Sequence, residues 1–86
     1  MLKLERISDQ LGTRIRMSGQ LRSDELGQAM AEVKCGRAVA LDLEEVELVD
    51  LEGVRFLNEC EAQDIAVLKC SPYIREWMLR ERAKEK

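Results

Sequence analysis

The run RAVALDL at residues 37–43 constrains the fold more than any other stretch, because it is apolar almost without interruption until Asp42. Such a run is typical of a strand that is buried on both faces of a sheet, with helices packed against it. Helical patterns stand on both sides of this strand. The first predicts a helix over residues 23–36, with Ser23 as its cap and two acidic residues in its first turn, and the second predicts a helix over residues 51–63. The apolar face of the first helix is set by Leu26, Ala29, Met30 and Val33.

The remaining segments extend this alternation of strands and helices. Residues 2–7 and 13–18 alternate apolar and charged side chains around the turn sequence SDQLG, which predicts an N-terminal hairpin. Residues 65–70 predict another strand, and Ser71 followed by Pro72 predicts the start of a third helix, with Ser71 as its cap. The predicted order is β-β-α-β-α-β-α, an α/β fold with a mixed four-stranded sheet and about three helices packed on it.

The composition narrows the classes of function. The chain has 86 residues, which predicts one domain over residues 1–86, with residues 76–86 as a charged helix end or tail. It contains no His, and the spacings of its three Cys match no zinc pattern, so we expect no metal site, no cofactor and no enzyme activity. We expect the thiols to be buried in a reducing cytoplasm.

Charge and hydropathy exclude two further classes of partner. The net charge is −3 and basic residues form no stripe before residue 75, so we do not expect nucleic-acid binding. No apolar run approaches the length of about 18 residues that a membrane span requires, and the first ten residues do not form a signal peptide. We therefore expect a cytoplasmic protein without direct membrane insertion.

Three segments, taken in order, carry a resemblance to a known family: RMSGQL at 16–21, ALDLEEVELVDLEGVRFL at 40–57 and IAVLKCSPYIREWM at 65–78. Together they resemble the STAS domains of bacterial anti-sigma factor antagonists. In ALDLEEVELVDLEGVRFL at 40–57, the strand ends in Asp42-Leu43, and residues 50–53 stand where the family carries Asp-Ser-Ser-Gly before a helix. RMSGQL at 16–21 resembles the family's second strand, and IAVLKCSPYIREWM at 65–78 resembles its later strand and the following helix. The resemblance implies a STAS-like fold that lacks the family's last strand and helix.

The resemblance also implies a regulator that works by partner switching. In the family, a kinase that is also the anti-sigma factor phosphorylates the second serine of the motif, and phosphorylation breaks the complex. Leu51 and Glu52 occupy the two serine positions here, and neither side chain has a hydroxyl group. Glu52 could stand in for phosphoserine and lock the chain in a non-binding form, or the domain could bind another partner without a switch. The missing serines also suit a second class, the STAS-like accessory subunit of a membrane lipid transporter, which binds a cytoplasmic ATPase.

The predicted partner-binding surface is the start of the helix over residues 51–63. On a helical wheel, the arc that packs on the sheet consists of Leu51, Val54, Leu57 and Cys60. The opposite, exposed stripe consists of Glu52, Arg55 and Glu59, with Phe56 partly exposed at its edge. We expect Asp50 to cap the helix, Glu52 to complement its dipole and Gly53 to allow close approach. The full predicted partner-binding set is Asp50, Leu51, Glu52, Gly53, Arg55, Phe56 and Glu59.

Three further features have structural interpretations. Asp42 lies near Asp50 in the sequence and could form an acidic pocket with it, but without a His, a nucleophile or a third ligand we expect it to accept backbone N–H bonds in the following turn. Trp77 is predicted to join Met78 in the core. An uncovered apolar edge on the third helix would favour a homodimer or a complex, while the charged residues 75–86 would form a solvated helix surface.

Overall fold

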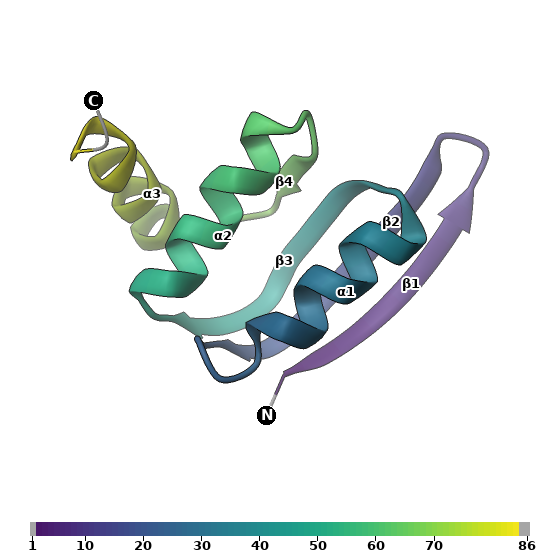
Figure 1. Ribbon diagram of the computed structural model, residues 1–86, viewed down its shortest axis with the longest axis horizontal. Coiled ribbons are helices and arrows are strands. Elements are labelled where there is room, and N and C mark those ends of the chain that lie inside the picture. Colours follow the sequence, from purple (N-terminus) through teal and green to yellow (C-terminus); the bar gives the residue numbers. More distant parts are fainter. Residues whose placement is uncertain (1, 85–86) are drawn as a thin grey trace.

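The computed structural model describes residues 2–84, and its seven elements follow the predicted order (Figure 1). The strands are β1 (Lys3–Asp9), β2 (Gly12–Leu21), β3 (Ala38–Val49) and β4 (Ala66–Leu68), and the helices are α1 (Leu26–Gly36), α2 (Leu51–Ala62) and α3 (Pro72–Lys84). The α/β class and the order β-β-α-β-α-β-α are thus confirmed. Residues 85–86 of the predicted charged tail lie outside the described residues.

The four strands form one mixed sheet in the order β1-β2-β3-β4. β1 and β2 form the predicted antiparallel hairpin, while β2, β3 and β4 run parallel to one another. The two parallel connections run through α1 and α2, which return the chain along the sheet. In Figure 1, α1 crosses in front of β2 and β3, and α3 lies beyond α2 at the opposite end of the molecule from β1.

β3 is longer than the strand predicted at residues 37–43, and the expected burial of this run on both faces is wrong at Val39, which is 45% exposed. The strand continues to Val49, because β2 pairs with it as far as Leu21, which lies opposite Val49. Along this extension the acidic side chains are exposed while Val46 and Val49 are buried, so a polar sequence remains a strand with one wet face. The strand therefore carries the chain directly to Asp50 at the start of α2.

The core lies between the sheet and the helices. Its most deeply buried side chains come from both layers: Ile15, Met17, Leu21, Leu41, Leu43, Val54, Leu57, Ile74 and Met78. Ile15 and Met17 confirm the alternation predicted for β2, because both point to the helix side of the sheet.

α1 begins later than predicted. Its first residue is Leu26, and its N-cap is Glu25, which makes no side-chain capping bond. The predicted cap, Ser23, instead donates its backbone N–H to the carboxylate of Asp50, which keeps the preceding residues in a turn. The predicted acidic first turn is therefore wrong. Met30, expected on the apolar face, is 45% exposed at the side of the helix.

α2 occupies nearly the predicted range, but its buried arc differs. Phe56, expected to be partly exposed, is only 6% exposed, whereas Leu51, expected in the core, is 38% exposed. The reason is that α2 contacts α1 and α3 as well as the strands, so side chains on its flanks are covered too. Asn58 is buried on one of these flanks.

α3 begins at Pro72 as predicted, although the side chain of Ser71 does not cap it. The Ser71 hydroxyl has no hydrogen-bond partner among the described residues, while the Ser71 carbonyl accepts a backbone N–H of the first turn at 3.0 Å. Ile74 and Met78 are buried, and Trp77 is partly buried against the core. The prediction for Trp77 is confirmed only in part.

Candidate functional site

A single carboxylate fixes the N-terminus of α2. Asp50 Oδ1 accepts a hydrogen bond from the backbone N–H of Gly53 at 2.9 Å, and Oδ2 accepts one from the backbone N–H of Ser23 at 2.8 Å. The backbone N–H of Asp50 donates to the carbonyl of Leu21 at 3.3 Å. The predicted cap is confirmed, and it also ties α2 to the segment between β2 and α1.

The same hydrogen bonds set the charge of Asp50. Partial burial by itself would raise the pKa of this carboxyl, but hydrogen bonds from Ser23 and Gly53 lower the pKa below its ordinary value of 3.8. Asp50 therefore stays negatively charged near neutral pH, at the positive end of the helix dipole.

Gly53 lies against the end of β2. A Cβ atom at this position would be 2.4 Å from the carbonyl oxygen of Leu21, which the backbone cannot accommodate without moving. The prediction that Gly53 allows close approach is confirmed. The first turn of α2 is thus seated directly on β2, and its outward side chains project from a fixed backbone.

The outward side chains of this turn and the next are Leu51, Glu52, Arg55 and Glu59, which together we call the α2 face. All four residues are exposed. Arg55 Nη1 donates to Glu52 Oε1 at 3.1 Å, although both side chains remain about half exposed. Arg55 Nε also lies 3.9 Å from Oε1 of Glu81, so this arginine connects α2 with α3. The exposed stripe predicted from the sequence agrees with this arrangement.

A groove of about 370 Å³ separates α1 from α2 beside the α2 face. Its apolar lining comes from Leu26, Met30, Val33, Phe56 and Cys60, and its polar rim from Lys34, Glu52, Arg55, Glu59 and Gln63. Phe56 therefore lies in the wall of the groove and not on the outer surface. Of the seven residues predicted to bind a partner, Gly53 and Phe56 are buried and support the α2 face from beneath.

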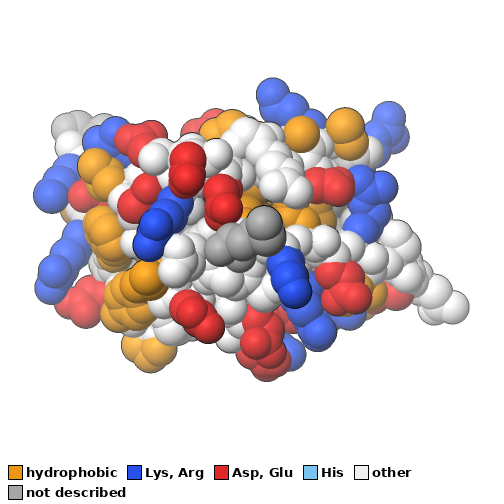
Figure 2. Space-filling view, turned by 90° about the horizontal axis from the view of Figure 1, so that it is seen from below, with side chains coloured by type: hydrophobic (Ala, Val, Ile, Leu, Met, Phe, Trp, Pro, Cys, Tyr) orange, Lys and Arg blue, Asp and Glu red, His pale blue; other side chains and the backbone are white. Residues whose placement is uncertain are grey.

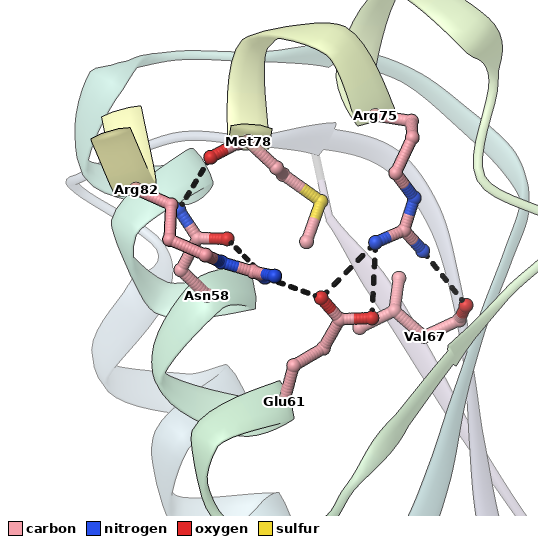
Figure 3. A network of polar contacts seen from close by, with 6 residues as sticks. All are labelled: Asn58, Glu61, Val67, Arg75, Met78 and Arg82. Carbon is pink, nitrogen blue, oxygen red and sulfur yellow. Dashed lines mark hydrogen bonds and ion pairs between the residues drawn. The ribbon is translucent and has the colours of Figure 1, made fainter. Parts of the chain in front are cut away.

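A polar network that the sequence did not reveal holds α3 against α2 (Figure 3). Arg75 Nη1 donates to both carboxylate oxygens of Glu61 at 3.0 Å, and Arg82 Nη2 donates to Glu61 Oε1 at 2.6 Å. Asn58 Nδ2 donates to the carbonyl of Met78 at 3.0 Å, and Asn58 Oδ1 accepts from Arg82 at 2.8 Å. The prediction of a purely solvated surface on this helix is therefore wrong for Arg75, which is partly buried, and for Glu81, which is buried, while Arg82 stays exposed although it binds Glu61.

Basic side chains compensate the negative charges of Glu61 on α2 and Glu81 on α3. Partial burial alone would raise the pKa of Glu61, but the hydrogen bonds from Arg82 and Arg75 lower it below its ordinary value of 4.5. Glu81 is only 6% exposed, with Lys84 Nζ at 3.3 Å and the Arg55 guanidinium at 3.9 Å. Because the partners come from different helices, no spacing rule along the chain predicts most of these pairs.

Asp42 has a structural role in β3. It is 4% exposed and accepts the backbone N–H of Glu44 at 3.0 Å, as predicted, although this bond lies within the strand and not in a turn. Arg16 Nε lies 3.9 Å from its other oxygen. Among residues 2–84, no group of three or more His, Cys, Asp or Glu is placed to hold a metal ion.

The three thiols have different environments. Cys60 is buried, Cys70 is partly buried and Cys35 is exposed, so the prediction of buried thiols is wrong for Cys35. Burial, with smaller contributions from the charges of Glu59 and Glu61, raises the pKa of the Cys60 thiol to about 11.

The surface is mixed in character. Acidic and basic side chains are interspersed over the face of the molecule that Figure 2 shows, with apolar areas between them. On α3, Tyr73 is 46% and Leu79 is 52% exposed, so apolar side chains of this helix do reach the surface. Within the described part of the chain, every helix is too short or too polar to cross a membrane.

The comparisons with known proteins find a similarity in fold and none in sequence family. No protein-family model and no curated protein matches the sequence. A solved structure, that of the anti-sigma factor antagonist SpoIIAA in its unphosphorylated form, is 21% identical and superimposes with a TM-score of 0.60. The chain has the STAS fold. The match covers 99% of this chain and 96% of the SpoIIAA chain, so the expectation that a last strand and helix are missing finds no support in it.

Proposed function

We propose that this chain is a non-enzymatic protein-interaction module, similar to the anti-sigma factor antagonists, which binds its partner through the α2 face. The observation that carries the proposal is the rigid presentation of this face, because Asp50 and Gly53 fix the first turn of α2 on the sheet. The likeness in fold to SpoIIAA, an anti-sigma factor antagonist, supports this class of function. The proposal includes a cytoplasmic location, where such regulators meet their partners.

The proposed module binds without a phosphorylation switch. Glu52 stands where the resembled family carries its regulated serine, and it has no hydroxyl to phosphorylate. A phosphate group would carry about −1.5 to −2 charges and three acceptor oxygens, whereas a carboxylate carries a single charge. In addition, the Arg55 guanidinium at 3.1 Å compensates the charge of Glu52. Glu52 therefore presents much less negative charge than phosphoserine would, which favours constitutive binding over a permanently locked form.

The proposed partner is a kinase-like anti-sigma factor or a related ATP-binding signalling protein. Affinity capture of the tagged chain from its host lysate, followed by calorimetric titration with the purified partner, tests this assignment. Recovery of such a protein supports the proposal. Recovery of a lipid-transporter ATPase instead would assign the chain to the alternative class of transporter accessory subunits.

The purified partner then tests whether the α2 face is the docking surface. Leu51→Asp and Glu59→Lys should each weaken binding by about tenfold or more, which corresponds to about 1.4 kcal/mol, because the first places a charge in the proposed interface and the second reverses one. Glu5→Lys on β1, an exposed glutamate at the other end of the molecule, serves as the control and should leave the affinity unchanged. Unchanged affinity of Leu51→Asp would contradict docking at this face.

Glu52→Ser separates the two interpretations of the missing serine. Constitutive binding predicts that this variant binds with nearly wild-type affinity in the absence of ATP. If the variant instead binds far more tightly than wild type, Glu52 holds the chain in a locked form.

A further inference from the structure

The outer edge of β1 is free for pairing within the described part of the chain. β1 is the first strand of the sheet and pairs only with β2, along all seven residues from Lys3 to Asp9. In Figure 1, no other described element lies beyond it. An exposed edge strand presents unpaired N–H and C=O groups, which a second extended strand can bind.

The side chains of β1 are self-complementary in one antiparallel register. When two copies of β1 are placed with Arg6 opposite Arg6, Lys3 of each copy lies opposite Asp9 of the other. Side chains must stay on their own face, so the alternative registers differ by steps of two residues. Those neighbouring registers place Glu5 opposite Glu5, or Glu5 opposite Asp9, and like charges directly opposite are destabilising. The ion pairs of these carboxylates with Arg16 and Arg14 are long, at 3.9 Å and 3.7 Å, and compensate their charges less than Glu32 compensates that of Arg6 at 2.6 Å.

The groups that this register requires are available. Lys3 is exposed and has no ion pair or side-chain hydrogen bond among the described residues. Asp9 uses Oδ1 to accept the backbone N–H of Leu11 at 2.8 Å, while its Oδ2 lies 3.7 Å from Arg14 and remains exposed. The central Arg6 is already neutralised, because its Nη2 lies 2.6 Å from Glu32 on α1.

The same register places apolar side chains beside one another. Ile7 is only partly buried, on the face of the sheet that β1 shares with Lys3, Glu5 and Asp9. With Arg6 at the centre, each Ile7 lies directly opposite Glu5 of the other copy, and the two Ile7 side chains are diagonal neighbours across the junction. Dimerisation would therefore cover apolar surface that the single chain leaves in water.

We propose that two copies of this chain associate through β1, as an antiparallel pair centred on Arg6, which joins their two sheets across a two-fold axis. The second copy is the occupant that the charge pattern favours, because each end of β1 supplies the opposite charge to the other end. The interface consists of one strand pair and is therefore small, so the dimer is weak and concentration-dependent.

Analytical ultracentrifugation over a series of protein concentrations tests the proposal. The expected result is reversible dimerisation, with a dissociation constant that rises as salt is added. Lys3→Glu turns two attractive pairs into repulsive ones and should raise the dissociation constant by about tenfold. Arg22→Glu makes the same change of net charge in an exposed loop and should leave the equilibrium unchanged. A chain that remains monomeric throughout, or a dimer that is indifferent to Lys3→Glu, overturns the proposal.

A second experiment tests the register by mixing two charge variants that should associate with each other. Asp9→Lys should also weaken self-association, but in an equimolar mixture with Lys3→Glu the new charges face each other in the heterodimer, while the native pair persists at the other end. The mixture should therefore dimerise better than either variant alone, with circular dichroism showing that both are folded. If the folded variants stay monomeric when mixed under conditions in which the wild type dimerises, the proposed register is wrong.

Discussion

Asp50 joins separate segments of the chain at the start of α2. Its carboxylate receives the backbone N–H of Gly53 within the helix and the backbone N–H of Ser23 from the loop before α1. Both amides lie where regular structure ends or begins, so neither has a partner in a helix or sheet ladder. One side chain therefore satisfies two donors and at the same time fixes how two helices begin relative to each other.

Replacement of Asp50 measures how much these two hydrogen bonds contribute to the free energy of unfolding. Asp50→Ala removes both acceptors and should lower the free energy of unfolding by about 1–2 kcal/mol. Asp50→Ser retains an acceptor for the helix cap but has only one side-chain oxygen, so its stability should lie between those of alanine and wild type. Urea unfolding followed by circular dichroism gives the comparison. Equal stability of Asp50→Ala and wild type would contradict this role.

Two glycine-to-alanine substitutions should have opposite effects. Gly53→Ala places Cβ 2.4 Å from the carbonyl oxygen of Leu21, and such overpacking should lower the free energy of unfolding by about 2–3 kcal/mol. Gly27→Ala meets no atom within 4 Å on the exposed side of α1, and the better helix propensity of alanine should raise stability by about 0.5–1 kcal/mol. Urea midpoints measure both changes. A harmless Gly53→Ala would show that α2 does not need its close seat on β2.

At the scale of the element, α3 depends on a few contacts of different kinds. Its buried apolar side chains are Ile74 and Met78, and its polar attachment converges on Glu61. Since two arginines of α3 bind this one carboxylate, its charge governs much of the electrostatic contact between α3 and α2. α3 also lies close to the α2 face, because Glu81 is 3.9 Å from the Arg55 guanidinium.

The attachment of α3 should therefore be sensitive to acid. The pKa of Glu61 is lower in the folded chain than its ordinary value of 4.5, so its contribution is fully present above that pH and is lost as pH falls through the lower, folded-state pKa. At about pH 7, Glu61→Gln should reduce the free energy of unfolding by about 1–2 kcal/mol, because it removes charged hydrogen bonds. Toward about pH 3 the difference from wild type should shrink.

Urea unfolding of wild type and Glu61→Gln across this pH range makes the measurement. Asp50 also has a lowered pKa and is retained in both proteins, so its own acid sensitivity cancels in the difference. A difference between the two proteins that does not change with pH would contradict the proposed role of the Glu61 charge.

The order of the elements could be predicted because each segment carries its own signal. The alternation in β2, the helical range of α2 and Pro72 at the start of α3 follow from local features, and all three agree with the structure, whereas the buried arc of α2 differs from the prediction. The limits of β3 and α1 depend on distant partners. β3 extends to Val49 because β2 pairs with it, and α1 starts late because Asp50 binds the amide before it.

In the candidate site, too, some residues could be predicted from the local sequence and others depend on distant parts of the chain. The roles of Asp50 and Gly53 follow from turn chemistry within a few residues, and the structure confirms both. The burial of Phe56 depends on α1, which lies beside it across the groove, and a helical wheel contains no information about that neighbour. Asn58 could not be assigned either, because it donates to the carbonyl of Met78 on another helix.

At the scale of the whole molecule, the two proposed surfaces lie apart. β1 is the outer strand at one end in Figure 1, whereas the α2 face adjoins α3, which lies at the other end. A dimer through β1 would therefore leave two α2 faces exposed, each able to bind a partner. Both surfaces require an intact sheet, since α2 is seated on β2 and β1 pairs with β2.

The rates at which the native cysteine thiols are modified measure whether the fold is intact. Cys60 is buried and the pKa of its thiol is raised to about 11, so in the folded chain it is both inaccessible and protonated. We expect iodoacetamide to modify Cys35 rapidly, and Cys60 only when the whole chain unfolds. Mass spectrometry of digested samples gives the two rates, and Cys35 serves as the internal control within each sample.

Gly53→Ala connects this measurement with global stability. If Cys60 reacts through global unfolding, a loss of about 2–3 kcal/mol should speed its modification by roughly 30- to 140-fold, because about 1.4 kcal/mol corresponds to a factor of ten. The rate at Cys35 should not change, since that thiol is exposed in the folded chain. Equal modification rates of Cys60 in wild type and in a destabilised Gly53→Ala would mean that the thiol is exposed by a local motion that leaves the seat of α2 on β2 intact, and not by unfolding of the whole chain.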